Sequence, residues 1–118
     1  MLAVDDSIHS KNAIRYAVKM SLFVKELSYT LCNIQSDISC FLLDEARTSV
    51  KAQSALDKLR KKNEEKSLEI LKKYKALMTG MGIAEHCIDF KTQPKKLGLA
   101  KDIIEIGQEK TYDAIVVG

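Results

Sequence analysis

The sequence predicts an α/β domain built on an open, doubly wound parallel sheet. Short apolar runs at Leu2–Val4, Ser28–Ile34, Glu85–Lys91 and Ala114–Val117 are typical of strands. Helical patterns stand between successive runs, so strands and helices alternate along the chain. The first and last runs are apolar at every position, as in strands that helices cover on both faces.

The first strand ends at Asp5-Asp6-Ser7, and a helix is expected from about Ser10. Ser7 and Ser10 can each cap the free N–H groups at its start. Helical spacing predicts an inward stripe, made of Ala13, Tyr16, Ala17, Met20 and Val24. The second strand, Ser28–Ile34, is followed by a polar loop over Gln35–Ser39.

A long helix is expected to end at Gly80 and Gly82, because no Gly or Pro stands between Asp44 and Met78. Its predicted apolar stripe is Ala52, Leu56, Leu59, Ile70, Leu71, Tyr74, Leu77 and Met78. Asn63 and Ser67 interrupt this stripe, so the middle of the helix is predicted to project past the sheet edge. Residues 44–53 fit a helix or a loop, and Phe41-Leu42-Leu43 fits a lid or the first turn of this helix.

The third strand is expected at Glu85–Lys91 and is followed by a loop at Thr92–Lys96. A helix over Gly98–Lys110 then offers Leu99, Ile103, Ile104 and Ile106 to the core, and Ala114–Val117 forms the fourth strand. Right-handed crossovers would place helices on both faces of the sheet.

Length and composition fit one domain over residues 1–118, with 46% hydrophobic and 30% charged residues. No apolar run approaches the ~20 residues that span a bilayer, and no signal peptide is visible, so we expect a cytoplasmic protein without a membrane partner. The net charge is +3. The basic stretch Lys51–Lys75 has no aromatic residue before Tyr74, so it is interpreted as a solvated helix face rather than a nucleic-acid site.

Three cysteines, Cys32, Cys40 and Cys87, cannot all pair, and none stands at C-x-x-C spacing. The two histidines are not spaced as zinc ligands, so no metal centre is expected. Cys32 and Cys87 fall in apolar runs and are interpreted as small buried side chains in a reducing compartment. Cys40 lies near a loop and could be a reactive thiol, but nothing in the sequence indicates a lowered thiol pKa.

The residues at the strand ends are the candidates for chemistry, since ligands of such sheets bind beyond the carboxyl ends of the strands. Asp5 continues directly from a buried strand, and its carboxylate can accept hydrogen bonds from a base or a ribose, or hold Mg²⁺. Asp6 and Ser7 are interpreted as helix-capping residues. Gly118 ends the last strand and would allow a phosphate to approach its backbone closely.

Other site types fit the sequence poorly. An acidic pair after a first strand resembles phospho-receiver domains, but those need an acceptor Asp at a later strand end, where this chain has Val117-Gly118. Walker and G-x-G-x-x-G loops are absent. His9 is interpreted as a surface residue, and no catalytic constellation can be assembled.

The terminal motifs resemble those of universal stress proteins. Ala3-Val4-Asp5-Asp6-Ser7-x-x-Ser10-x-x-Ala13-x-x-Tyr16-Ala17 is similar to the first strand and helix of that family. Residues 96–104 and 112–118 are similar to its third helix and fourth strand. The resemblance runs over Met1–Gly118 in order and spacing, with a looser match over Leu27–Gly82.

This resemblance implies an adenine-nucleotide alpha hydrolase-like sheet in the order 3-2-1-4-5, usually in a homodimer. Many members bind ATP and others do not. In the binders, the residue matching Asp5 contacts the adenosine, those matching Ala3 and Val4 line its pocket, and a backbone position aligned to Ile34 contacts the adenine. Gly118, preceded by Val117, matches the first glycine of a phosphate motif, G-x2-G-x9-G-[ST].

The chain departs from the family because the rest of that motif and the fifth strand are absent from the sequence. We therefore expect the chain to be incomplete at both ends and, alone, to bind ATP weakly and to expose a sheet edge. Asn33-Ile34 also stands where His-Val is more usual.

The expected function is that of a stress-response regulator that binds ATP, with or without Mg²⁺, and at most hydrolyses it slowly. The alternative is a nucleotide-independent interaction module, in which Phe41-Leu42-Leu43 and the Lys-rich helix form a partner surface.

Overall fold

The computed structural model describes residues 1–118, in which strands and helices alternate along the chain. In chain order, the elements are β1 (Leu2–Ala3), α1 (Ile8–Met20), β2 (Tyr29–Gln35), α2 (Cys40–Ala46), α3 (Val50–Gly80), the 3₁₀ turn η1 (Glu85–Cys87), β3 (Ile88–Pro94), α4 (Leu99–Glu109) and β4 (Val116–Val117).

The four strands form one open sheet in the order β3-β2-β1-β4, and every neighbouring pair is parallel. Leu2 is paired with Leu31 of β2 on one side and with Val116 of β4 on the other. The predicted α/β class and its parallel sheet are therefore confirmed, and the order agrees with a doubly wound fold.

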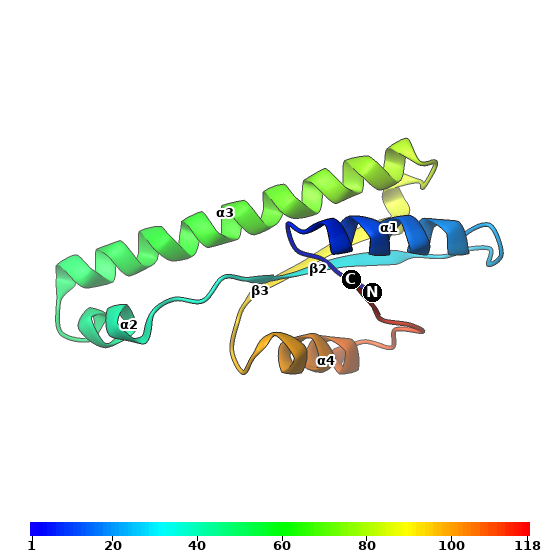
Figure 1. The fold of residues 1–118 in the computed structure, drawn as a ribbon. Helices are drawn as coiled ribbons and strands as arrows, with labels where there is room; N and C mark the ends of the chain where they lie inside the picture. Colours follow the sequence, from blue (N-terminus) through cyan, green and yellow to red (C-terminus); the bar gives the residue numbers. More distant parts are fainter.

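Helices cover both faces of this sheet. Figure 1 shows α1 and α3 on one face and α4 on the other. The buried side chains divide accordingly: Leu2, Ile14, Leu31 and Leu71 belong to the cluster under α1 and α3, and a smaller cluster under α4 includes Ile103. The division follows from strand geometry, because successive side chains of a strand point to opposite faces.

Helix α1 begins at Ile8, two residues before the predicted start, and Ser7 caps it by accepting a hydrogen bond from the N–H of Ser10. Its buried side chains are Ser10, Ala13, Ile14, Ala17 and Val18. The predicted stripe was wrong at three positions. Tyr16 and Met20 lie one helical step outside the buried arc and are exposed, and Val24 follows the end of the helix.

Residues 44–53, for which the sequence fits a helix or a loop, contain the break between two helices. Helix α2 ends at Ala46, and Ser49 caps α3 by accepting a hydrogen bond from the N–H of Ala52. Phe41-Leu42-Leu43 lies in the first turn of α2.

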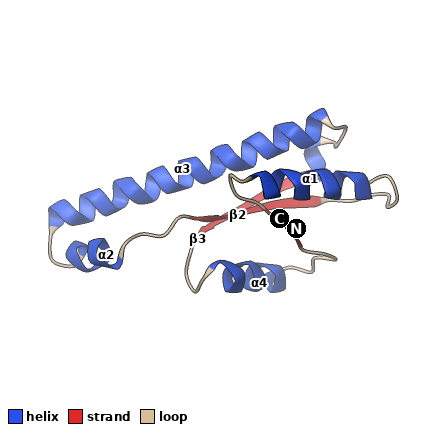
Figure 2. Ribbon diagram, viewed as in Figure 1, coloured by secondary structure: helices blue, strands red, loops and turns tan.

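Helix α2 and the first half of α3 form an arm that extends past the sheet and lengthens the molecule to 55 Å (Figure 2). Sequence analysis predicted that the middle of the long helix would project, around Asn63 and Ser67. Instead, the amino-terminal half projects, and Ser67 is buried against the sheet with 2% of its surface exposed.

The carboxyl end of α3 is closed by a Schellman motif. Gly82 has the positive φ of 100° that this motif requires, and the N–H of Ile83 donates to the carbonyl of Met78. The next residues form the η1 turn, so β3 starts three residues later than predicted and takes in Thr92–Pro94, which had been assigned to a loop. Pro94 is tolerated because it ends an edge strand.

Helix α4 buries a narrower stripe than predicted, with Ile103 and Ile106 in the core but Leu99 and Ile104 exposed. The helix begins after Gly98, which has no side chain to cap it. The buried carboxylate of Asp102 instead accepts hydrogen bonds from the backbone N–H groups of Lys96 and Leu97. These hydrogen bonds lower the pKa of Asp102 below its ordinary value.

Candidate functional site

A small cavity opens at the carboxyl ends of β1, β2 and β4. Strand order reverses between β1 and β4, because the connection after β1 runs towards β2 and β3 while β4 returns to the other side of β1. Such a switch point is where ligands of doubly wound sheets bind. The cavity has a volume of about 80 Å³.

All six residues that sequence analysis selected for nucleotide binding line this one cavity: Ala3, Val4, Asp5, Ile34, Val117 and Gly118. Four further residues complete the lining: Ser10, Cys32, Leu99 and Ile103. The six lie at the ends of three strands, and the outermost two, Ala3 and Gly118, are 115 positions apart in the chain. The sheet therefore brings together residues that were selected from separate positions in the sequence.

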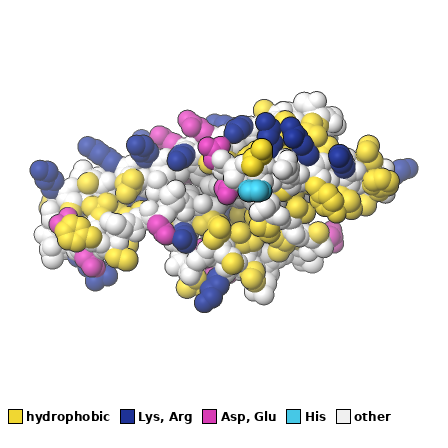
Figure 3. Space-filling view, in the orientation of Figure 1, with side chains coloured by type: hydrophobic (Ala, Val, Ile, Leu, Met, Phe, Trp, Pro, Cys, Tyr) yellow, Lys and Arg dark blue, Asp and Glu magenta, His cyan; other side chains and the backbone are white.

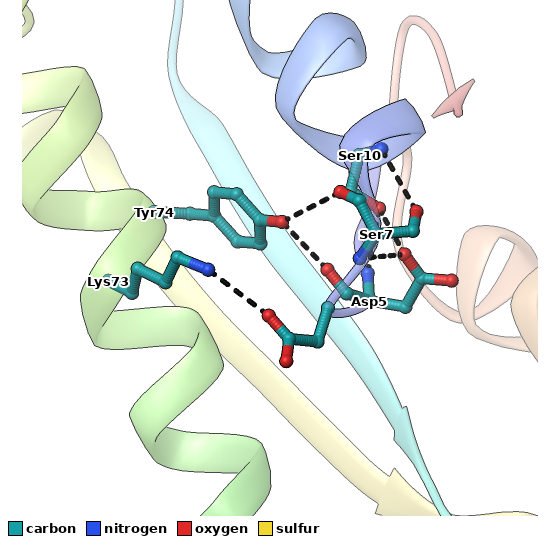
Figure 4. Close-up of polar contacts among 6 residues, drawn as sticks. Asp5, Ser7, Ser10, Lys73 and Tyr74 are labelled. Carbon is teal, nitrogen blue, oxygen red and sulfur yellow. Dashed lines mark hydrogen bonds and ion pairs between the residues drawn. The ribbon is translucent and has the colours of Figure 1, made fainter.

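Asp5 is the only charged residue in the lining, and its carboxylate is held in one orientation (Figure 4). Its Oδ1 accepts hydrogen bonds from the backbone N–H of Ser7 at 3.0 Å and from the Ser10 hydroxyl at 2.7 Å. Ser10 in turn accepts a hydrogen bond from the N–H of Asp5 at 2.8 Å. No group of the chain donates to Oδ2, so this oxygen is available to a ligand.

These contacts also fix the charge of Asp5. Hydrogen bonds from Ser7 and from Ser10 hold its pKa below the ordinary value and outweigh the opposing effect of partial burial. The carboxylate is consequently ionised at neutral pH and acts only as an acceptor. A hydroxyl or amino group of a ligand is the natural partner of such an oxygen.

Helix α3 anchors the backbone of the loop that carries Asp5. The Tyr74 hydroxyl donates to the carbonyl of Asp5 at 2.8 Å and also lies 3.3 Å from the carbonyl of Ser7 (Figure 4). Tyr74 itself is 1% exposed. Asp6 is turned outwards and forms an exposed ion pair with Lys73 at 3.1 Å.

This arrangement separates the two aspartates, so Asp6 takes no part in the cavity. Sequence analysis had interpreted Asp6 as a helix-capping residue, and its carboxylate forms an ion pair instead. The interpretation of Ser7 as the cap is confirmed.

Gly118 lies directly against the first turn of α1. A Cβ atom at this position would stand 2.5 Å from the carbonyl oxygen of His9 and 2.8 Å from the nitrogen of Ser10. Both neighbours are backbone atoms, which cannot rotate away as a side chain would. Gly118 is therefore required here by close packing.

The remaining walls are apolar. Ala3 and Cys32 belong to the core cluster under α4, with Ile34 packed against them, and Ile103 closes the cavity from α4. Burial raises the pKa of the Cys32 thiol to about 11, so the thiol is neutral and unreactive at neutral pH. Its interpretation as a small buried side chain is confirmed, whereas Cys87 lies in η1 and outside the strand that was predicted for it.

A buried polar network that sequence analysis missed joins β2, α3 and β3 and holds the backbone of Val4, a residue of the cavity lining. The Asn33 side chain donates to the carbonyl of Val4 at 2.8 Å, and its oxygen accepts a hydrogen bond from Ser67 at 2.6 Å. Ser67 also lies 2.6 Å from the Thr92 hydroxyl. Asn33 in an otherwise apolar strand was the available signal, since a buried amide needs partners.

The lining defines the chemistry that the site can support. An ionised carboxylate beside apolar walls suits recognition of a flat, partly polar group through one or two hydrogen bonds. Ligand pockets usually measure about 300–1,000 Å³, so a cavity of about 80 Å³ would enclose only part of a nucleotide. The lining contains no histidine and no second carboxylate to act as an acid–base pair.

Elsewhere, no three His, Cys, Asp or Glu side chains are grouped closely enough to hold a metal ion. None of the helices combines the length and the apolar character that crossing a bilayer demands. No protein-family model matches the chain, and no curated protein sequence does either. The function must consequently be inferred from the residues and their geometry.

Proposed function

We propose that this chain is a nucleotide-binding regulatory domain of the universal stress protein kind, with an adenine nucleotide bound at the cavity beside Asp5. The observation that carries the proposal is that Asp5 and Gly118, together with the four other residues that the family resemblance implies, line one cavity at the switch point of the sheet. The strand order, which matches the first four positions of the order 3-2-1-4-5, supports it as well.

In the proposed complex, the adenine ring contacts the apolar walls near Ile34 and Ala3. The free Oδ2 of Asp5 accepts a hydrogen bond from a ribose hydroxyl or from the adenine amino group. The phosphates leave the cavity past the backbone of Gly118, which lies against the first turn of α1. A Mg²⁺ ion, when present, would be bound chiefly by phosphate oxygens and water.

We further propose that the domain acts by binding rather than by turnover. Asp5 is engaged as an acceptor, and the other titratable side chain of the lining, Cys32, is a neutral thiol because burial raises its pKa to about 11. Hydrolysis of ATP would then be slow at most. A cytoplasmic homodimer, which the resemblance implies, completes the proposal.

Isothermal titration with ATP, ADP and AMP tests the nucleotide site. Asp5→Asn keeps the shape of the side chain but removes its charge, and Asp6→Asn is the matched control because it changes the neighbouring exposed carboxylate. Hydrogen bonds to charged groups contribute about 1.5–3 kcal/mol, so Asp5→Asn should weaken binding about tenfold to a hundredfold. Asp6→Asn should leave the affinity unchanged. Equal effects of the two variants would contradict the site.

The arm favours a second candidate, a nucleotide-independent interaction module. Phe41 is 72% exposed at the start of α2, and Val50 is 85% exposed at the start of α3. Lysine and arginine side chains follow the outer side of α3 (Figure 3). If no adenine nucleotide binds to the wild-type chain, this second function replaces the first.

A further inference from the structure

Strand β3 forms one open edge of the sheet, because the order β3-β2-β1-β4 gives it a neighbour on one side only. It is seven residues long, as long as β2, whereas β4 at the opposite edge has two residues. Exposed edges of this length are templates for pairing with another chain, and proteins usually block them with charged side chains. The charges on β3 are Asp89 and Lys91.

These two charges are arranged so that β3 is complementary to itself. Asp89 and Lys91 flank Phe90 and point to the α4 face of the sheet, where Lys91 lies 3.6 Å from Glu109. If two copies of β3 pair antiparallel with Phe90 opposite Phe90, each Asp89 lies directly opposite a Lys91. Opposite charges in such cross-strand positions are favourable, and like charges are not.

The same charges select this alignment over its neighbours. The nearest alignments that keep the α4 faces of both copies on the same side of the joined sheet differ by two residues. A shift of two residues in one direction would place Asp89 opposite Asp89, and the reverse shift would place Lys91 opposite Lys91. Both neighbouring alignments bring like charges together at the two-fold axis. Only the alignment centred on Phe90 turns the usual blocking charges into two ion pairs.

On the other face of the sheet, β3 borders a groove that has room for a further side chain. A groove of about 560 Å³ lies between β3 and the carboxyl-terminal half of α3, with Phe90, Ile83 and Ala76 as its apolar lining. The Lys75 ammonium lies 5.3 Å from the centre of the Phe90 ring and 3.5 Å from Glu85, at the rim. Phe90 of a second copy would enter this space beside Phe90 of the first.

We propose that a second copy of this chain binds at β3, so that antiparallel pairing of the two edges joins two four-stranded sheets into one continuous sheet. The two ion pairs between Asp89 and Lys91 set the alignment, and the two Phe90 rings share the groove. The contact surface lies on β3, whereas the cavity beside Asp5 lies between β1 and β4. The dimer therefore forms with or without a bound nucleotide.

Sedimentation velocity of the 118-residue chain over a series of concentrations tests this proposal through charge reversal. The wild type should show a monomer–dimer equilibrium. Asp89→Lys places lysines opposite lysines and should abolish the dimer, and Lys91→Asp should do the same. The double variant, with both changes, restores opposite charges at both positions and should restore the dimer.

The double variant separates the proposed pairing from a general loss of structure, because it carries both substitutions and still dimerises. Circular dichroism verifies that each single variant remains folded. A control pair at a distant surface, Asp6→Lys and Lys73→Asp, should leave the dimer intact. A wild type that is monomeric throughout the series would overturn the proposal, as would a dimer that persists in either single variant or is absent from the double variant.

Discussion

The hydroxyl of Tyr74 is predicted to hold the loop that carries Asp5, and Tyr74→Phe removes only this group. The hydroxyl donates to the carbonyl of Asp5 at 2.8 Å and approaches the carbonyl of Ser7 at 3.3 Å. Tyr74 lies on the buried side of α3 and is 1% exposed, and phenylalanine keeps the packing of its ring. The change in stability should therefore report the contribution of the hydroxyl and not a change in core packing.

The structure sets the size of the expected effect. One intramolecular hydrogen bond contributes about 1 kcal/mol, and an acceptor left unsatisfied inside the protein costs about 1–3 kcal/mol. The Asp5 side of the loop is exposed, so water can replace part of the lost contact. We expect the free energy of unfolding to fall by about 1–2 kcal/mol. For a chain of this length, the melting temperature would fall by about 4–8 °C.

Tyr29→Phe is the matched control. Its hydroxyl donates to the carbonyl of Ala17 at 3.3 Å, under α1 and away from the loop, and Tyr29 is also buried. Both variants should lose stability in urea unfolding followed by circular dichroism, with the smaller loss in Tyr29→Phe. Only Tyr74→Phe should loosen the Asp5 loop in hydrogen exchange and weaken nucleotide binding.

The outcome that would refute this reasoning is an unchanged free energy of unfolding in Tyr74→Phe. Equal hydrogen exchange at the loop in both variants would also refute it, because the Tyr74 hydroxyl would then not stabilise the conformation of the Asp5 loop.

Three further predictions concern other contacts of the fold. Ser67→Ala should lower the free energy of unfolding by about 1–3 kcal/mol, measured in urea, because it leaves the buried Asn33 oxygen without its donor. Gly118→Ala should lower the melting temperature, because its Cβ would overlap the backbone of the first turn of α1. The pKa of Asp102 is lowered by the N–H of Lys96 and its neighbours, so Asp102 stabilises the fold fully above its ordinary value of 3.8. That contribution is lost as the pH falls through the lower pKa of the folded state. A urea series from pH 6 down to about pH 2 should therefore show a smaller acid-induced loss of stability in Asp102→Asn than in the wild type.

The elements could be predicted because their signals are local. Alternation of apolar runs and helical stretches identified all four strands and the three longer helices, and Ser7 was recognised as a cap. The phase of the α1 stripe was wrong because two neighbouring arcs of that helix are both apolar. Only its packing against β1 and α3 decides that Ile14 is buried and Tyr16 is exposed.

Strand boundaries and buried polar contacts depended on partners that are distant in the chain. The end of β3 is set by its pairing with β2, where Gln35 is aligned with Pro94. Ser67 interrupts an apolar stripe in the sequence, yet it is buried because Asn33 and Thr92 face it across the sheet. No local feature of the sequence tells whether a serine in a helix is exposed to solvent or buried against polar partners.

For the candidate site, the sequence by itself determined which residues stand at the strand ends, since a strand ends where its apolar run ends. Asp5 and Gly118 could be selected on that basis. The family resemblance implied a strand order in which the fourth strand pairs with the first, but no residue pattern in the chain encodes it. The tertiary structure shows that β4 pairs with β1 on the side away from β2, which brings those ends to one cavity. It also decided that Tyr74 holds the loop and that Leu99 and Ile103 complete the wall. The physical reason is that strand order and helix packing arise from contacts between residues far apart in the chain, which no local pattern encodes.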